Sequence, residues 1–198
     1  GSLGYIFSAI RITAGSAEDV SVQSISWNQS GSAGATDLAN LKVNIDGTDY
    51  PVTVSSDSKY YTASVPGGLT IVKGNQKEIY VKGDILNGSN RTVDFDLYRY
   101  TDLYIVGKQY GYGITPSATE VAASADDGDF HAGNPNFDAR EATIGSGTIT
   151  VTAATAVPAQ NIAINLSEQP LGAFDVDIKG ETVTVSSIII RLSSNGAG

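Results

Sequence analysis

The side chains best suited to chemistry are the oxygen donors of an acidic segment between residues 126 and 141. Its carboxylates and amides are Asp126, Asp127, Asp129, Asn134, Asn136, Asp138 and Glu141. Ca²⁺ takes about six to eight oxygen ligands from such groups and from backbone carbonyls in a loop that can bend. The glycine and glutamate positions do not fit the EF-hand register. The segment therefore predicts either an irregular Ca²⁺ site or a solvated polar turn.

Catalytic patterns are weak in this chain. His131 is its one histidine, and we expect it on the surface rather than at a metal. Asp94 and Asp96 share one face of a predicted strand, as the paired acids of a glycosidase can, but the alternation places that face toward solvent. The sequence contains no nucleophile elbow, P-loop, dinucleotide-binding glycine pattern or zinc-protease motif. We predict that the protein is not an enzyme, and a hydrolase with an unrecognised site is one alternative.

Tyrosines and sequons are the candidate residues for contacts with sugars. Five tyrosines lie close together in the sequence, at Tyr98, Tyr100, Tyr104, Tyr110 and Tyr112. They serve either as packing residues or as an aromatic platform for a glycan. Asn-x-Ser/Thr sequons, which are glycan acceptors in a surface protein or chance matches in a polar chain, occur at Asn28, Asn87, Asn90 and Asn165. A carbohydrate-binding or adhesive surface module is therefore a second alternative.

Composition limits the partners. The chain of 198 residues carries a net charge of −9 and has a pI of about 4.4. A nucleic-acid partner requires clustered lysine and arginine, so we expect none. Hydrophobic residues make up 41% of the chain, which suffices for a packed core. No apolar run reaches the roughly 18 residues of a membrane-spanning helix, so we expect no membrane span. The absence of cysteine excludes disulfides.

Short alternating strands position these residues. Apolar and polar residues alternate over 41–46 and 93–98, and Gly, Pro and Asn separate the runs. The pattern predicts an all-β protein, an antiparallel Greek-key (immunoglobulin-like) β-sandwich with extra terminal strands and a long acidic loop. We expect the sandwich over residues 3–108 and a Tyr/Gly-rich and acidic loop region over 109–146. Residues 147–198 would form strands that pack on the sandwich or on a neighbouring subunit.

A stretch near the start of the chain recurs near its end. Residues 18–27 read Glu-Asp-Val-Ser-Val-Gln-Ser-Ile-Ser-Trp, and residues 181–190 read Glu-Thr-Val-Thr-Val-Ser-Ser-Ile-Ile-Ile. In both, the apolar spacing changes from two to three after the second valine. Because a step of three moves side chains to the other face of a strand, we expect a β-bulge or a crossing between sheets. The second copy needs a partner strand from the preceding segment or from another copy of the chain.

Four short blocks carry a family resemblance: Asp37–Val43, Gly107–Gly113, Leu171–Phe174 and Gly180–Glu181. In them the chain resembles S-layer-like or wall-associated surface proteins of uncultivated bacterial lineages, which contain tandem immunoglobulin-like sandwiches. The resemblance implies an extracellular or cell-surface location and a scaffolding or adhesive role. It carries over no catalytic or binding residue.

The preferred interpretation is an extracellular structural protein that assembles with copies of itself into a filament, tube or surface array. We expect β-strand exchange, in which the segment 3–13 or 182–192 of one chain completes a neighbour's sheet. The residues expected at this contact are Tyr5, Phe7, Ile10, Ile12, Val183, Val185, Ile188 and Ile190. Ca²⁺ bound in the acidic segment would make the joint more rigid.

Overall fold

The computed structural model describes residues 2–118, 122, 124–180, 182–191 and 193. The chain divides into two units, Gly1–Gly145 and Ser146–Gly198. The described residues form antiparallel strands and a 3-10 helix at Tyr100–Asp102, without an α-helix. The predicted all-β class is therefore confirmed. In the same described residues, no helix is long and apolar enough to cross a membrane.

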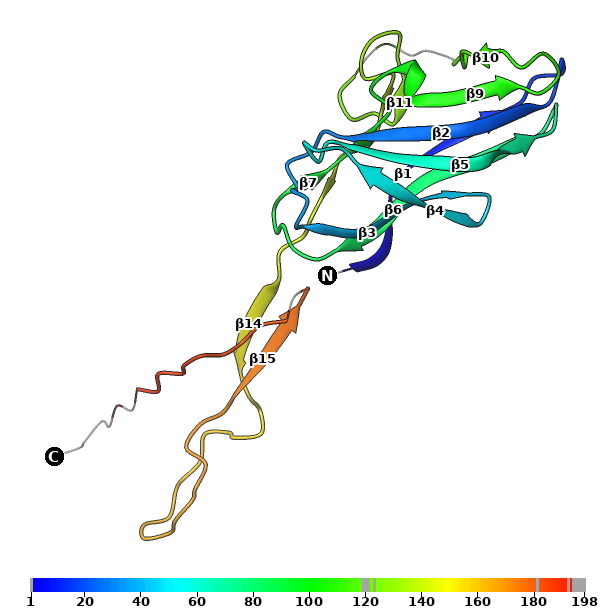
Figure 1. Cartoon of the computed structure of the whole chain (residues 1–198). Helices are drawn as coiled ribbons and strands as arrows, with labels where there is room; N and C mark the ends of the chain where they lie inside the picture. The colour runs from blue at the N-terminus through cyan, green and yellow to red at the C-terminus, as the bar shows by residue number, and fades with distance from the viewer. Residues whose placement is uncertain (1, 119–121, 123, 181, 192, 194–198) are drawn as a thin grey trace. The chain divides into compact units, whose positions relative to one another are not determined.

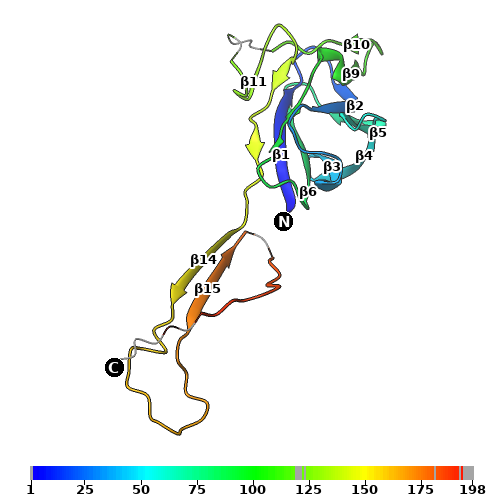
Figure 2. The same cartoon turned by 90° about the vertical axis from the view of Figure 1, so that its left-hand side faces the viewer.

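The first unit contains a curled sheet whose two halves form a sandwich-like arrangement (Figures 1 and 2). The strand order is β1-β6-β3-β4-β5-β2-β9-β10, and β8 also pairs with β2. The sheet curls at β4, because one part of this strand pairs with β3 and its last residues pair with β5. The strands are β1 (Ser2–Thr13), β2 (Val20–Gln29), β3 (Leu38–Ile45), β4 (Thr48–Val54), β5 (Tyr60–Ile71), β6 (Gln76–Ile85), β8 (Phe95–Asp96), β9 (Leu103–Gly107) and β10 (Gly113–Ile114).

A β-bulge changes the register of β2, as predicted. Val22 and Ser24 have partners in both β5 and β9, whereas Gln23 between them is skipped in both pairings. Val22 and Ile25 lie on either side of the bulge and are fully buried. One extra residue thus brings both halves of the apolar pattern to the same core.

β5 continues through Pro66-Gly67-Gly68, although this sequence predicts the end of a strand. The strand runs unbroken from Tyr60 to Ile71, and its pairing with β2 shifts register across this tripeptide. A Cβ on Gly68, whose φ is +71°, would lie 2.1 Å from Oγ of Ser21 in β2. Glycine therefore lets β5 bulge close to β2 without ending the strand. The predicted break is wrong.

The first strand belongs to the core of its own unit. β1 pairs with β6 along most of its length, and Phe7 and Ile10 are only 8% and 5% exposed. Ile12 is half-buried, whereas Tyr5 is exposed. Phe7 and Ile10 were expected at a contact between subunits, and this position corrects that expectation. They are already buried because the apolar face of β1 closes one side of the sandwich.

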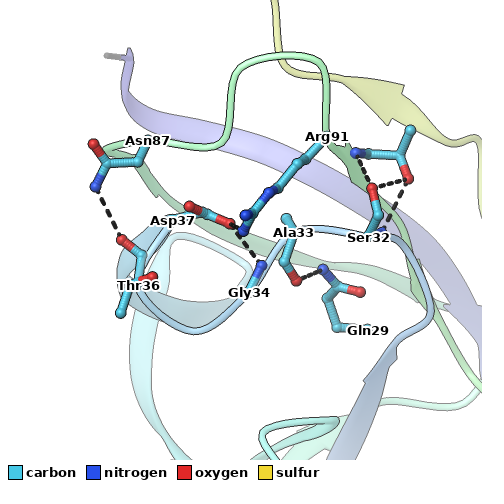
Figure 3. Close-up of polar contacts among 9 residues, drawn as sticks. Gln29, Ser32, Ala33, Gly34, Thr36, Asp37, Asn87 and Arg91 are labelled. Carbon is cyan, nitrogen blue, oxygen red and sulfur yellow. Dashed lines mark hydrogen bonds and ion pairs between the residues drawn. The ribbon is translucent and has the colours of Figure 1, made fainter.

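Asp37 fastens two loops of the first unit together (Figure 3). Its carboxylate Oδ2 accepts hydrogen bonds from the Gly34 backbone N–H and from Arg91 Nη1, both at 2.7 Å. Its backbone carbonyl accepts the N–H of Leu86 at 2.7 Å. The hydrogen bond from Gly34 and the Arg91 guanidinium lower the pKa of this buried carboxyl. The hydrogen bond from Arg91 therefore holds the chain three residues before Asp94 against Asp37.

The second unit contains one antiparallel strand pair. β14 (Thr148–Ala153) pairs with β15 (Phe174–Lys179), and Ile149 lies opposite Ile178 while Val151 lies opposite Val176. Alternate residues of a strand share a face, so the apolar residues form one face and the threonines and aspartates form the other. Strands were expected within residues 147–198, and β14 and β15 are two of them. All of their residues are exposed.

The second copy of the repeat is not a strand in the described residues. Residues 182–191 form no strand, and Glu181 and Leu192 lie outside the described part of the chain. The predicted strand is therefore not formed within 182–191 of the single chain, and its pairing with another copy stays a prediction. β2 is a strand because β5 and β9 flank it, whereas a ladder cannot form without such neighbours. The two copies thus share their apolar spacing, but within 182–191 the second copy lacks the strand pairing that β2 has.

Candidate metal centre

Asp94 and Asp96 lie on a short run of chain that is buried on both faces. The run lies along β7 (Thr92–Val93) and β8, and Phe95 and Leu97 belong to the core. Asp94 and Asp96 alternate with these residues, yet they are only 5% and 3% exposed. The prediction that their face meets solvent is therefore wrong.

The acidic segment itself covers the two aspartates. Within it, β11 (Asp129–Phe130) pairs with β12 (Phe137–Asp138). The backbones of Phe137 and Leu97 exchange N–H···O=C bonds of 3.1 Å, and the Phe137 ring packs edge-on against Trp27 at 6.5 Å between centres. This apolar anchor lays the β11–β12 hairpin over the strand that carries Asp94. Alternation within one strand cannot predict a cover that comes from elsewhere in the chain.

Too few donors reach the two buried carboxylates. Ser30 Oγ lies 3.1 Å from Oδ2 of Asp94 and 2.7 Å from Oδ2 of Asp96, but its single hydrogen can serve only one of them. The backbone N–H of Ala139 donates to Oδ1 of Asp96 at 2.8 Å. Oδ1 of Asp94 is buried and has no hydrogen-bond partner in the described part of the chain. An unsatisfied buried oxygen costs about 1–3 kcal/mol, so this one calls for a proton or a cation.

A third carboxylate adds to the negative charge. Burial and the charge of Asp96 raise the pKa of Asp94 to about 7. Burial also raises the pKa of Asp96 and of Asp138 in β12. The ion pairs formed within the described residues involve other carboxylates. Ionisation of the three acids is therefore not balanced by a neighbouring lysine or arginine in an ion pair.

The three carboxylates converge. Asp94, Asp96 and Asp138 can each offer one oxygen such that all three oxygens lie within 4.8 Å of one another. Bonds of 2.3–2.6 Å to a single Ca²⁺ span ligand oxygens up to about 5 Å apart. The cluster can therefore hold a metal ion, and its oxygen donors fit a hard cation.

One of the seven predicted metal ligands, Asp138, belongs to this cluster in the described part of the chain. Asp127 Oδ1 accepts the Asp129 N–H at 3.0 Å and lies 3.0 Å from His131 Nε2. The Asn136 amide donates to the His131 carbonyl at 2.9 Å. These contacts shape the hairpin. The exposed members of the predicted set are Asp126, Asp129, Asn134 and Glu141.

His131 lies inside the hairpin rather than on the surface. It is 5% exposed, and its backbone N–H donates to the Asn136 carbonyl at 2.8 Å. Its ring contacts the Asp127 carboxylate, four residues earlier. The predicted surface position is wrong, because the ring is buried beside the Asp127 carboxylate.

The candidate sugar-contact residues are spread over both units. Asn87, Asn90 and Asn165 are exposed, whereas Asn28 is half-buried within β2. Nδ2 of Asn87 donates to the Thr36 carbonyl at 3.2 Å (Figure 3). The exposed fractions of the five clustered tyrosines range from 37% to 78%, for Tyr98, Tyr100, Tyr104, Tyr110 and Tyr112.

A cavity of about 400 Å³ lies between β1 and β9. Its described walls are mainly apolar and include Ile10, Ile12, Leu103 and Ile105. Glu18 is the one carboxylate among them, and His131 is not part of the wall. This cavity therefore does not provide the histidine and carboxylates together that a hydrolase of this composition would use.

No protein-family model, curated protein or solved structure matches this chain. The resemblance to surface proteins consequently rests on the four sequence blocks, and function has to be argued from the residues themselves.

Proposed function

We propose that this chain is an extracellular or cell-surface structural protein that assembles with copies of itself through its second unit. The uncovered apolar face of β14 and β15 carries this proposal. Its residues are 40% to 60% exposed: Ile149, Val151, Phe174, Val176 and Ile178. A two-stranded pair is at best marginally stable in water. An apolar face of this kind gains stability when another surface covers it.

The segment 182–191 supports the same function. It has no strand partner among the described residues, and Ile188, Ile189 and Ile190 are 59%, 92% and 74% exposed. Addition of such a segment to a sheet edge satisfies its backbone groups and buries alternate side chains. Burial contributes roughly 25 cal/mol per Å² of apolar surface, so three isoleucines favour association.

A second copy of the chain is the proposed partner. β1 and β10 stand at the two ends of the strand order of the first unit, so each has an edge without a neighbour in the described sheet. The segment 182–191 repeats the pattern of β2, a strand that already pairs within this sheet. A neighbour's edge strand therefore suits it chemically. Repetition of the contact from chain to chain produces a filament, tube or array.

Ca²⁺ is the proposed stabilising ion of the assembled protein. The support is the convergence of three carboxylates and the lack of any nitrogen or sulfur ligand among them.

Sedimentation velocity over a concentration series tests the proposal on the full chain. We expect the wild-type protein to form large species as its concentration rises, and the double variant Ile188→Asp/Ile190→Asp to stay monomeric. Two buried charges would oppose strand addition. Ile164→Asp is the matched control because Ile164 is 91% exposed and lies outside both apolar segments. A wild-type monomer at every concentration, or equal loss of assembly in the control, contradicts the proposal.

A carbohydrate-binding or adhesive module is the second candidate, and the exposure of the tyrosines favours it. Tyr110 and Tyr112 are 67% and 78% exposed, so their rings are available to stack on a sugar. A glycan array with the wild-type protein and Tyr110→Ala tests this candidate. Binding that disappears in the variant supports it, and an array without hits rules it out for the glycans present.

A further inference from the structure

We infer that Asp94, Asp96 and Asp138 form a Ca²⁺ site that fastens the β11–β12 hairpin onto β8. The three residues lie within the first unit, so the site does not require a second copy of the chain. It differs from the loop site predicted from the acidic segment, because two of its three carboxylates come from the strand beneath that segment.

The unpartnered oxygen of Asp94 points to a ligand independently of the clustering. Asp94 is only 5% exposed, and its Oδ1 has no hydrogen-bond partner among the described residues. Solvated carboxylates on a protein surface need no such compensation, whereas a buried carboxylate oxygen does. A cation placed among the three acids supplies the missing contact and neutralises their charge.

The donor set selects the kind of ion. Carboxylate oxygens favour Ca²⁺, Mg²⁺ or Mn²⁺ over Zn²⁺ and copper, which prefer imidazole or thiolate. Mg²⁺ requires near-ideal octahedral geometry and gives up its water reluctantly. Ca²⁺ accepts irregular geometry and bonds of 2.3–2.6 Å, which suits a buried site formed by two separate segments. Ca²⁺ is therefore the ion that we assign to this site.

Neighbouring groups orient the proposed ligands. The Ala139 N–H holds Oδ1 of Asp96 at 2.8 Å, which leaves its Oδ2 for the hydroxyl of Ser30 or for the ion. The backbone bonds between Leu97 and Phe137 hold the two ligand-bearing segments together. A bound ion adds a second fastening beside these bonds. The segment 126–139 should consequently be better protected with Ca²⁺ than without it.

Isothermal titration of chelator-stripped full-length protein with CaCl₂ tests the inference. We expect the wild-type protein to bind Ca²⁺ and to gain thermal stability from it. In Asp94→Asn and Asp138→Asn we expect the affinity to fall by about tenfold or more, because even outer-shell changes at metal sites cost about 10–100-fold. Asp129→Asn is the matched control, since Asp129 is an exposed acid of the same hairpin outside the cluster.

Thermal unfolding in chelator separates loss of the site from loss of the fold. In chelator at about pH 8, where Asp94 is ionised, Asp94→Asn should melt at or above the wild-type temperature, because it removes a buried charge that lacks compensation. Three results would overturn the inference: a wild-type protein that does not bind Ca²⁺, unchanged affinity in Asp94→Asn, or a larger loss in Asp129→Asn than in Asp94→Asn. Assembly can fail in the sedimentation experiment while Ca²⁺ binding persists, so the two proposals fail separately.

Discussion

Single residues around Asp94 show why burial cannot be read from alternation alone. The sequence correctly marks the acidic segment as rich in oxygen donors, and Asp138 belongs to the observed cluster. It places Asp94 and Asp96 on a solvent face, because the residues next to them in the sequence do not show that the β11–β12 hairpin packs over this strand. Phe130 and Phe137 are the nearest signal, since two aromatic residues within an acidic segment need an apolar place to pack.

The close approach of Gly31 to β7 gives a residue-scale prediction. A Cβ at this position would lie 2.4 Å from the carbonyl oxygen of Thr92 in β7, so Gly31→Ala must push the loop that holds residue 31 away from this strand. We expect a loss of about 1–3 kcal/mol in the free energy of unfolding, measured by urea denaturation. Gly15→Ala is the control because no atom of the described residues lies within 4 Å of a Cβ there. Equal stability of the two variants would contradict the prediction.

At the scale of elements, patterns that depend on near neighbours could be predicted and pairings could not. The change of spacing after Val22 predicted the bulge of β2, because period-two alternation has to be restored locally. The same spacing in residues 182–191 predicted a strand that is not formed, because strand formation depends on a partner. Pro66-Gly67-Gly68 resembled a strand end, yet the contact between Gly68 and β2 makes it a bulge within β5.

The layer between β8 and β12 gives an element-scale prediction for the metal-free protein. Burial and Asp96 raise the pKa of Asp94 to about 7, above its ordinary value of 3.8. Ionisation therefore costs the folded state more than the unfolded state, and this contribution to stability is lost as the pH rises toward and through 7. In chelator, we expect the melting temperature to fall between about pH 5 and about pH 8. Asp94→Asn should weaken this dependence, and a wild-type melting temperature that rises over the same interval would contradict the assignment.

At the scale of the whole molecule, the two units differ in how well they bury their own apolar residues. The first unit encloses Trp27, Phe95 and the isoleucines of its central strands. The second leaves a complete apolar strand face exposed and a repeated segment without a partner. Strands were predicted in the second unit, but the sequence does not show which surface covers their apolar face. That difference is the physical basis of the proposed assembly.

Backbone hydrogen exchange of residues 182–191 tests the proposed assembly most directly. In dilute protein these amides should exchange rapidly, because the segment has no described ladder partner. At concentrations where large species form, they should become protected together with the edge strand that receives them. Protection that is already present in the dilute monomer would place the partner within the same chain. Rapid exchange in the assembled protein would show that this segment does not hold the copies together, and either result contradicts the account.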